Sequence, residues 1–517
     1  MNSVGMPPDT IFSLSSGHGK CGVAVIRVSG ASAGNALMKM GNLRQLPTPR
    51  VAVLRKVIHP DSAEHIDNGL IIWFPAPNSF TGEDCVEFHV HGGPAILVSM
   101  VTALSAIPGV RQAEAGEFTK RAFMNGKLDL TEVEGLGDLI HAETEAQRKQ
   151  ALRQMDGALS QLYTSWRQRI IKVIADVEAH IDFGEDELIE DHILESAASR
   201  AEEIQKEIQI HLQDNRQGER LRNGVHVAIL GEPNVGKSSL LNSICQRPAA
   251  IVSHIPGTTR DIVESAVNIG GFPVLLSDTA GLRDTVDIVE KEGVRRALNR
   301  ARLSDVKVVV VDVQSFLRHW KTSANNIDSD VKQHLGYIGI IEDPTESSNV
   351  NENDVSMETD SGINMTGHTN TAISREKIPS EDLQNVILVL NKSDLLEGRD
   401  VNMDLPHSCK GMDVCMVSCK TGQGMEAFVQ VLAEKIKILC GGNLLAGNPS
   451  LTQARHRLLL NNCVHHLTRF SQYYRFGDEV LAAESLRKTI REMGKLTGKI
   501  STEDILDVIF KDFCIGK

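Results

Sequence analysis

The sequence predicts a multidomain α/β and α+β protein: an α/β domain inserted into an α-helical bundle domain, with an α+β domain before both. Three observations support this prediction. Between 223 and 441, short apolar runs alternate with helical patterns, as in a parallel sheet covered by helices. On both sides of it, in 126–222 and 442–517, apolar residues recur every three or four positions. Residues 1–125 instead mix alternating strands with a helix.

Composition limits the classes of function. A chain of 517 residues suggests about three domains. The net charge of −13, from 54 basic and 67 acidic residues, excludes a global basic field, so any RNA contact has to be local or shared with a partner. Nine cysteines without a C-x-x-C pair favour free thiols over a zinc site or a disulfide framework. No apolar run is long enough to cross a bilayer, so we expect no membrane insertion.

The first domain, residues 1–125, reads as alternating strands followed by a helix. We expect strands at 9–15, 22–29, 69–74 and 87–91, and a helix at 95–107. His89 and His91 fall on one face of a strand, which is a geometry that could hold a metal ion. No third ligand is near in the sequence, so we favour hydrogen-bonded histidines beside the Gly92-Gly93 turn.

The strongest chemical signal follows an apolar run at 225–230. It reads Gly231-Glu-Pro-Asn-Val-Gly236-Lys237-Ser238, the G-x-x-x-x-G-K-[ST] pattern between a strand and a helix. Glycines let backbone N–H groups turn inward around phosphates, and the helix N-terminus adds positive charge. Lys237 is expected at the β- and γ-phosphates, and the Ser238 hydroxyl at Mg²⁺. This is a P-loop.

Further boxes follow the P-loop in a fixed order. They are Gly257-Thr258-Thr259-Arg260-Asp261, Asp278-Thr279-Ala280-Gly281, Asn391-Lys392-Ser393-Asp394 and Ser418-Cys419-Lys420. The second and third of them end apolar strands. Asp394 selects the base, because a carboxylate accepts two hydrogen bonds from the N1–H and 2-amino groups of guanine, and adenine offers no such pair.

These five boxes resemble those of the translation-factor-related GTPases, so we expect a Ras-like P-loop GTPase domain that binds GTP with Mg²⁺. Ser238 and Thr259 are the expected Mg²⁺ ligands. The residues expected at the nucleotide are Asn234, Val235, Gly236, Lys237, Ser238, Ser239, Ser253, Thr258, Thr259, Asp278, Thr279, Ala280, Gly281, Asn391, Lys392, Asp394, Ser418, Cys419 and Lys420.

The flanking regions are helical. Thr131 and Glu134 have the spacing of a capping box, and an apolar stripe from Leu152 to Val177 predicts a long helix. A second helix is expected over roughly 192–222. Residues 322–382 are rich in polar residues and poor in aromatic ones, which predicts a disordered insertion within the α/β domain.

Four stretches carry a family resemblance. They are Asn78–Asp84, His91–Pro94, Gly116–Asp129 and the terminal Phe513-Cys-Ile-Gly-Lys517. With the GTPase boxes, they are similar to the MnmE (TrmE) family of tRNA-modifying GTPases over nearly the whole chain. The resemblance implies a homodimer formed through the N-terminal domain.

The resemblance also implies a folate site. Arg27, Glu87, Lys127 and Lys517 match the family's positions for a tetrahydrofolate derivative, 5,10-methylene or 5-formyl. A carboxylate suits the amino edge of a pteridine, and cations suit a glutamyl tail. The family places the one-carbon unit on carbon 5 of the tRNA wobble uridine, position 34, together with an FAD-containing MnmG-type partner. Cys514 stays open as a nucleophile, with a buried structural thiol as the alternative.

Hydrolysis needs an unusual arrangement. Leu282 stands where many small GTPases carry the glutamine that orients water, and leucine cannot bind water. The resemblance implies K⁺ in place of an arginine finger, held by Asn234, Ser253, Ile255 and Thr258, so we expect K⁺-stimulated hydrolysis. It also implies that Glu290 is the catalytic glutamate, acting through water beside Lys237.

The last expectations concern location and alternatives. The insertion at 322–382, and Ser418-Cys419-Lys420 in place of the commoner Ser-Ala-Lys, favour the animal mitochondrial branch, whose product is 5-taurinomethyluridine. The first twenty residues show no signal or transit peptide pattern, so a cytoplasmic location is the alternative to the mitochondrial matrix. The competing functions are a ribosome-assembly GTPase, which usually carries a KH domain or a second P-loop, and a non-catalytic GTP-dependent scaffold.

Overall fold

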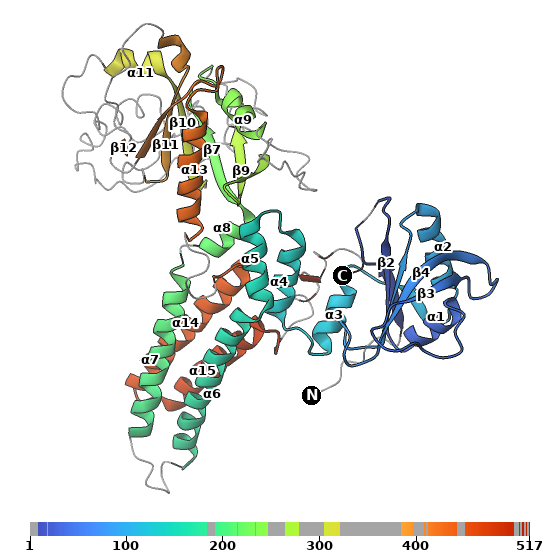
Figure 1. Cartoon of the computed structure of the whole chain (residues 1–517). Helices are drawn as coiled ribbons and strands as arrows, with labels where there is room; N and C mark the ends of the chain where they lie inside the picture. Colours follow the sequence, from blue (N-terminus) through green and yellow to red (C-terminus); the bar gives the residue numbers. More distant parts are fainter. Residues whose placement is uncertain are drawn as a thin grey trace, which may run out of the picture. The chain divides into compact units, whose positions relative to one another are not determined.

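The structure is a computed structural model that falls into two compact units (Figure 1). Unit 1 comprises 1–142, 148–214 and 448–517, and unit 2 comprises 143–147 and 215–447. The residues that the structure describes are 9–17, 19–183, 192–214, 216–232, 234–246, 264–278, 304–320, 384–396, 408–409, 412–441, 450–500, 506, 509–510, 513 and 516.

Unit 1 begins with a six-stranded sheet in the order β3-β4-β5-β2-β1-β6. Neighbouring strands are antiparallel except β1 and β6, which are parallel. Helices α1 and α2 pack on one face, over a core that includes Phe12, Ile26 and Phe88. The bounds are β1 Thr10–Leu14, β2 Ala24–Ser29, α1 Ala33–Met40, β3 Val53–Ile58, β4 His65–Phe74, β5 Cys85–Val90, α2 Pro94–Ser105 and β6 Val110–Gln112.

This sheet differs from the prediction at its edge. Strand β3 was not predicted, and β4 begins at His65 instead of residue 69. β3 is an edge strand whose middle residues, Leu54 to Lys56, are exposed, so its sequence lacks a buried apolar pattern. The first residues of β4 pair with this strand, and the early start of β4 was missed together with it.

Two helices lead from this sheet into the bundle, α3 (Glu117–Met124) and α4 (Leu130–His141). The capping box predicted at Thr131 and Glu134 is wrong. Asp129 is the N-cap and accepts from the N–H groups of Thr131 and Glu132, while Glu132 accepts from the N–H of Asp129. Glu134 is instead buried in an ion pair, and its carboxylate is therefore unavailable for capping.

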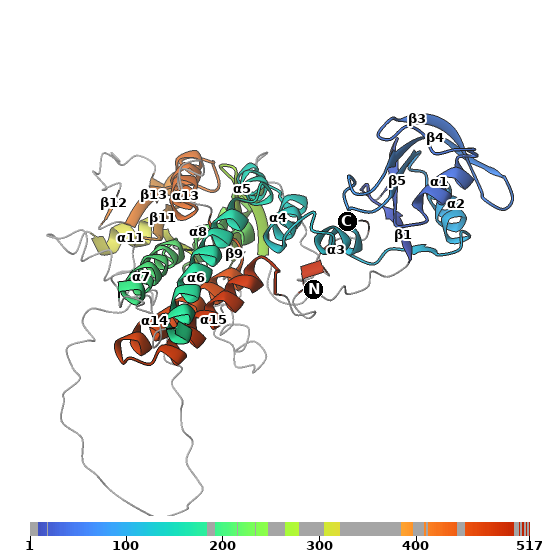
Figure 2. The same ribbon diagram turned by 90° about the horizontal axis from the view of Figure 1, so that it is seen from below.

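Four helices form the bundle and lie side by side in both views (Figures 1 and 2). They are α6 (Ala158–Phe183), α7 (His192–Leu212), α14 (Ala454–Arg475) and α15 (Glu479–Leu496). Their shared core includes Trp166, Ile204 and Phe470. The predicted long helix is interrupted at Gly157, where α5 (Glu145–Met155) ends and the backbone φ is 81°. The predicted second helix ends at Leu212, and α8 (Gln217–Asn223) follows as a separate helix.

Unit 2 is an α/β fold with a seven-stranded sheet in the order β12-β13-β11-β10-β7-β9-β8. The five inner strands are parallel, and β12 and β8 pair antiparallel at the edges. Helices α9 and α13 cover one face and α11 the other. The bounds are β7 Val225–Leu230, α9 Lys237–Cys245, β8 Glu264–Ile269, β9 Phe272–Asp278, β10 Val306–Asp312, α11 Val313–Trp320, β11 Val386–Asn391, η2 Ser393–Leu396, β12 Ser408–Cys409, β13 Met412–Met416 and α13 Met425–Leu439.

Several predictions concern residues outside the described ranges. They include the insertion at 322–382 and Cys514. Among the helices that the structure does describe, none combines the length and apolar character needed to span a bilayer.

Candidate functional site

The P-loop connects β7 to α9, as its sequence predicts. Two of its glycines adopt left-handed backbone conformations, with φ of 144° at Gly231 and 104° at Gly236. A Cβ at Gly231 would clash with the carbonyl oxygen of Val310 on β10, and a Cβ at Gly236 would clash with Nδ2 of Asn391. The loop backbone lies directly against the ends of the neighbouring strands β10 and β11, and neither glycine position therefore has room for a side chain. This is the close backbone arrangement that a phosphate cradle requires.

The P-loop carries four polar side chains predicted at the nucleotide: Asn234, Lys237, Ser238 and Ser239. Lys237 begins α9 and is 8% exposed, and its Nζ donates to the carbonyl oxygens of Gly231 and Glu232 at 2.9 and 2.8 Å. These bonds hold the ammonium group over the loop. Ser238 and Ser239 are exposed in the first turn of α9, and Asn234 is exposed with φ of 65°. A hydroxyl at a helix N-terminus suits Mg²⁺ beside a phosphate, so the position of Ser238 is compatible with its predicted role as a Mg²⁺ ligand.

Asn391 joins the P-loop to the predicted guanine site. Its Nδ2 donates to the carbonyl oxygen of Val235 at 2.8 Å, and its Oδ1 accepts from the N–H of Cys419 at 3.2 Å. Asn391 is 3% exposed, so both contacts are shielded from water. One side chain therefore connects three of the predicted boxes.

The carboxylate of Asp394, which is predicted to bind guanine, accepts a hydrogen bond from a buried hydroxyl. The hydroxyl of Ser418, which is fully buried, donates to Oδ1 of Asp394 at 2.7 Å and accepts from the N–H of Thr421 at 3.2 Å. Asp394 is half-buried and Lys420 is exposed. Burial raises the pKa of the Cys419 thiol, so this group stays protonated beside the base site.

Lys392 has a partner that the sequence did not reveal. Its Nζ lies 2.9 Å from Oδ2 of Asp312, at the end of β10. Burial raises the pKa of Asp312, but hydrogen bonds from Lys392 and from the N–H groups of Ser315 and Gln314 outweigh burial and hold it below its usual value. The sequence does mark Asp312 as the end of an apolar strand, just as it marks Asn391. In the structure these two residues are register partners.

The remaining predicted GTP residues are only partly described. Asp278 ends β9, and its backbone pairs with Ile229 of β7, beside the P-loop. The others lie outside the described residues: Ser253, Ile255, Thr258, Thr259, Thr279, Ala280, Gly281 and Glu290. The predicted K⁺ site and catalytic glutamate therefore stay predictions.

A second candidate site lies on the sheet face opposite α1 and α2. Arg27 on β2 and Glu87 on β5 are register partners, and Nε and Nη2 of Arg27 lie 3.1 and 3.0 Å from Oε1 of Glu87. The guanidinium also lies over the rings of Phe80 and Phe118, at 5.1 and 5.9 Å from their centroids. Both charged side chains keep about a fifth of their surface exposed, 20% and 18%. The pair is thus oriented, yet still open to a ligand.

The other two predicted folate residues are less closely defined. Lys127 is exposed, and its Nζ donates to the carbonyl oxygen of Pro77 at 3.2 Å. Lys517 lies outside the described residues, but Gly516 accepts a hydrogen bond from Oγ of Ser15 at 2.9 Å. Gly516 therefore lies against the end of β1, the strand whose Ser13 is the register partner of Arg27 on β2.

The two histidines noted in the sequence are each paired with a carboxylate. Nε2 of His89 lies 3.2 Å from Glu87, and Nδ1 of His91 lies 2.9 Å from Asp67. Within the described parts of the chain, no three His, Cys, Asp or Glu side chains come together as a metal site.

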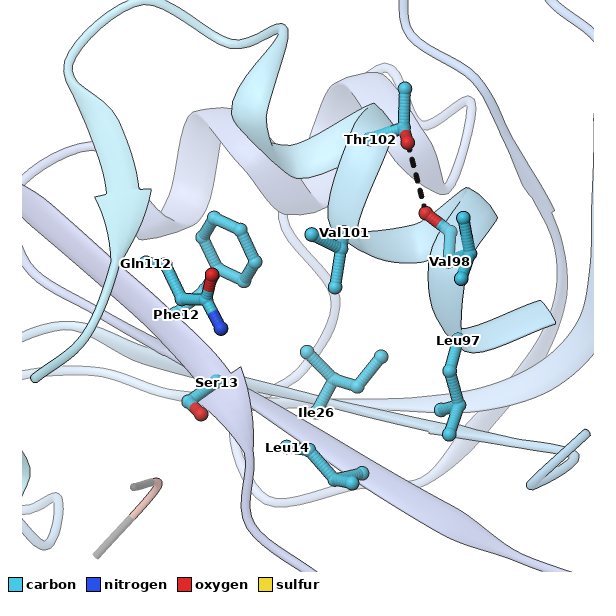
Figure 3. Close-up of a pocket in the computed structure, with 9 residues that line it drawn as sticks. All are labelled: Phe12, Ser13, Leu14, Ile26, Leu97, Val98, Val101, Thr102 and Gln112. Atoms are coloured by element: carbon cyan, nitrogen blue, oxygen red, sulfur yellow. Dashed lines mark hydrogen bonds between the residues drawn. The ribbon is translucent and has the colours of Figure 1, made fainter. Parts of the chain in front are cut away.

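A pocket of about 330 Å³ lies between α2 and β1 (Figure 3). Its lining is mainly apolar and includes Phe12, Ile26 and Val101, with the Gln112 amide at one side. Of the predicted folate residues that the structure describes, Arg27, Glu87 and Lys127, none lines it. It is therefore distinct from the face that carries Arg27 and Glu87.

The signature loop Asn78–Asp84 has a structural role that its sequence did not explain. Glu83 accepts from Ser29 at 2.7 Å and from Arg121 at 3.2 Å, while Asn125 donates to the carbonyl oxygen of Thr81 at 2.7 Å. The Arg121 side chain is only 4% exposed. This buried network fixes the loop that carries Phe80 over Arg27.

Comparisons with known proteins agree with this architecture. A family model described as the MnmE helical domain matches residues 130–514, and one described as the GTP-binding protein TrmE N-terminus matches 10–127. The mitochondrial 5-taurinomethyluridine-tRNA synthase subunit GTPB3 of Danio rerio is 48% identical over 512 residues, which are 98% of this chain and 93% of that protein. Its human counterpart is 46% identical over 98% of this chain and 93% of that protein.

Bacterial proteins match over the same length. The tRNA modification GTPase MnmE of Parvibaculum lavamentivorans is 43% identical over 98% of this chain and 100% of its own length. Among solved structures, the G domain of the T. maritima FeoB iron transporter covers 42% of this chain and 98% of its own, with 21% identity and a TM-score of 0.21, too low to support any argument. Because a family model covers most of the chain and relatives match it nearly end to end, the chain belongs to the MnmE/TrmE family.

Proposed function

We propose that this chain is the GTP-hydrolysing subunit of an enzyme that modifies the wobble uridine of tRNA, and that its product in mitochondria is 5-taurinomethyluridine. The observation that carries the proposal is the match of 98% of the chain to a subunit named for that product. The guanine site supports it, because the P-loop, Asn391 and Asp394 form one connected arrangement.

Domain roles are part of the proposal. Residues 223–441 are the GTPase domain, 126–222 with 442–517 the helical domain, and 1–125 the folate-binding and dimerisation domain. The division into two compact units supports the first two assignments. The partly exposed Arg27–Glu87 pair, with Gly516 bonded to Ser15 at the end of the neighbouring strand β1, supports a site for a tetrahydrofolate derivative that supplies the one-carbon unit.

The partners follow from the chemistry. A one-carbon unit carried at the formyl level has to be reduced before it can become a methylene linkage on carbon 5 of uridine, and an FAD-containing MnmG-type protein would supply that reduction. Leu54 and Leu70 are exposed register partners on the face that carries the Arg27–Glu87 pair, and such an apolar patch supports a homodimer formed through this domain. We assign the chain to the mitochondrial matrix because the animal relatives are named mitochondrial.

Hydrolysis would depend on K⁺. Asn234 is exposed at the P-loop, where an amide oxygen could bind a monovalent cation beside the phosphates, and Glu290 would orient water. GTP turnover by the full-length chain should be several-fold faster in KCl than in NaCl. Equal rates in the two salts would remove K⁺ from the proposal.

One experiment separates this function from its competitors. Nucleosides from the tRNA of cells lacking the chain are analysed by mass spectrometry, with the wild-type chain restored as the control. We expect the modified wobble uridine to disappear and to return on restoration. Normal wobble uridine in the deficient cells would refute the modification function and favour ribosome assembly or a scaffold.

A further inference from the structure

The chain rejoins unit 1 through residues 451–457, which we call the return segment. Its polar groups bond to elements that are far apart in the sequence. Thr452 donates to Oε1 of Gln154 on α5 at 2.9 Å, and Gln154 in turn donates to the carbonyl oxygen of Thr131 on α4. The return segment is thus connected through Gln154 to both α5 and α4.

Asp214 is the last residue of unit 1 before the chain departs into unit 2. Its Oδ1 lies 2.6 Å from Nη2 of Arg457, and its Oδ2 accepts from the N–H of Leu451 at 3.3 Å. Arg457 also donates to the carbonyl oxygen of Leu212, at the end of α7, at 2.8 Å. One carboxylate therefore fastens the point where the chain leaves unit 1 to the segment by which it returns.

The first turn of α14, which also carries Arg457, contains a buried charged cluster. Glu134 of α4 lies 3.0 Å from Nε of Arg455 and 2.7 Å from Nε2 of His456, and its side chain is only 5% exposed. Arg455 also donates to the carbonyl oxygens of Lys495 and Leu496, which end α15. Buried ion pairs add little stability compared with apolar packing, and in some proteins they specify geometry instead. The cluster therefore suits a role in fixing position.

The aromatic core makes this end of the bundle rigid. Tyr163 of α6 is fully buried, and its ring centroid lies 5.6 Å from that of His456 and 6.1 Å from that of His211 on α7. A displacement of the return segment would have to move His456 against Tyr163. Because packed cores have discrete arrangements, such a displacement would reach α6 and α7 as well.

We infer that Asp214, Arg455 and Arg457 are positioning residues that hold the departing and returning chain in fixed register, so that nucleotide-dependent changes in unit 2 act on the helical bundle. This inference rests on the proposed function. It assigns to these residues the coupling of GTP hydrolysis to tRNA modification, and no part in hydrolysis itself.

The test compares Arg457→Met, which keeps the apolar stem but removes the fork of donors, with Arg487→Met as the matched control. Arg487 forms an exposed pair with Glu178 elsewhere on the bundle. For each full-length variant, GTP hydrolysis is measured on purified protein. The modified fraction of wobble uridine is measured in cells lacking the endogenous chain, at matched protein abundance.

We expect Arg457→Met to lower the ratio of modification to hydrolysis by about 5-fold or more, the lower bound of ordinary coupling between sites, while Arg487→Met leaves it unchanged. A smaller change, or an equal loss in the control variant, overturns the inference. If Arg457→Met does not accumulate, Asp214→Asn decides by the same ratio, since it keeps the shape and removes only the charge. Failure of the wild-type chain to restore the modification would instead refute the proposed function.

Discussion

Gly236 offers the sharpest test of the nucleotide site, because its replacement by alanine has two separable costs. The first is conformational: φ is 104°, where a residue with a Cβ is strained by about 1–3 kcal/mol. The second is steric, because the new Cβ would clash with Nδ2 of Asn391. To relieve the clash, Asn391 has to give up its bonds to Val235 and Cys419, which contribute about 0.5–1.5 kcal/mol each.

Together these costs come to about 2–6 kcal/mol for Gly236→Ala. Part of this cost lowers the free energy of unfolding and part weakens nucleotide binding, because Asn391 connects the P-loop to the base-binding loop. If the binding free energy of GTP is weakened by about 2 kcal/mol, its dissociation constant rises about 30-fold. Fluorescence titration with a labelled guanine nucleotide measures the affinity, and thermal denaturation of unit 2 measures the stability.

Gly271→Ala is the matched control. Gly271 in the β8–β9 turn also has a positive φ, 89°, but nothing lies within 4 Å of the position that a Cβ would take. It should carry the conformational cost alone and bind GTP like the wild type. If both variants bind GTP within threefold of each other, Asn391 does not link the two loops in the way that the distances indicate.

Three further outcomes are expected. Asp394→Asn should weaken GTP binding by about 10- to 100-fold, since an amide replaces one acceptor by a donor, and it should improve binding of xanthosine triphosphate; unchanged base preference in a competition assay would contradict the base assignment. Arg27→Met should weaken binding of 5-formyltetrahydrofolate at least about tenfold, by loss of a charge-assisted bond, while GTP hydrolysis stays unchanged; calorimetry that finds wild-type affinity would exclude Arg27 from the site. Burial lowers the pKa of His211 from 6.5 to about 4, so the folded bundle excludes a proton that the unfolded chain binds below pH 6.5. The free energy of unfolding should therefore fall by up to about 3 kcal/mol between pH 6.5 and 4, as reported in urea by the fluorescence of Trp166, whose ring lies 5.5 Å from that of His211. His211→Leu should flatten that slope between pH 6.5 and 5, and an unchanged slope would assign the dependence to another group.

The predicted features that the structure confirms are those with a strong local cause. The strand that precedes the P-loop is apolar at almost every position because β7 is buried on both faces, and the loop itself has an unmistakable glycine spacing. Strand β3 was missed for the opposite reason, because an edge strand keeps few buried positions. The capping box at α4 was misplaced by two residues because both spacings occur there, and only the burial of Glu134 against α14 decides between them.

Contacts between distant residues were the least predictable part of the site. Asp312 ends β10 and Lys392 directly follows β11, two strands separated by a long stretch of sequence, and the parallel register of β10 and β11 brings the two side chains within 2.9 Å. Asn391 was expected at the nucleotide because of its motif, whereas its bond to Val235 depends on how closely Gly236 lets the P-loop approach. The sequence marks only that Asp312 and Asn391 each end an apolar strand, whereas the pairing of those two strands follows from topology.

The terminal signature shows how a motif known only by resemblance acquires a physical explanation. Phe513 packs against Phe510 and lies so close to Gly137 that a Cβ there would be 3.3 Å from its ring, tighter than ordinary contact, inside the small core around α4. Gly516 has φ of 99°, and a Cβ there would clash with the carbonyl oxygen of Leu14 on β1. Only glycine fits that position, and it brings the chain end to the strand whose Ser13 pairs with Arg27. The spacing of the signature is therefore set by two anchors, a phenylalanine in one core and a glycine against β1 of the sheet.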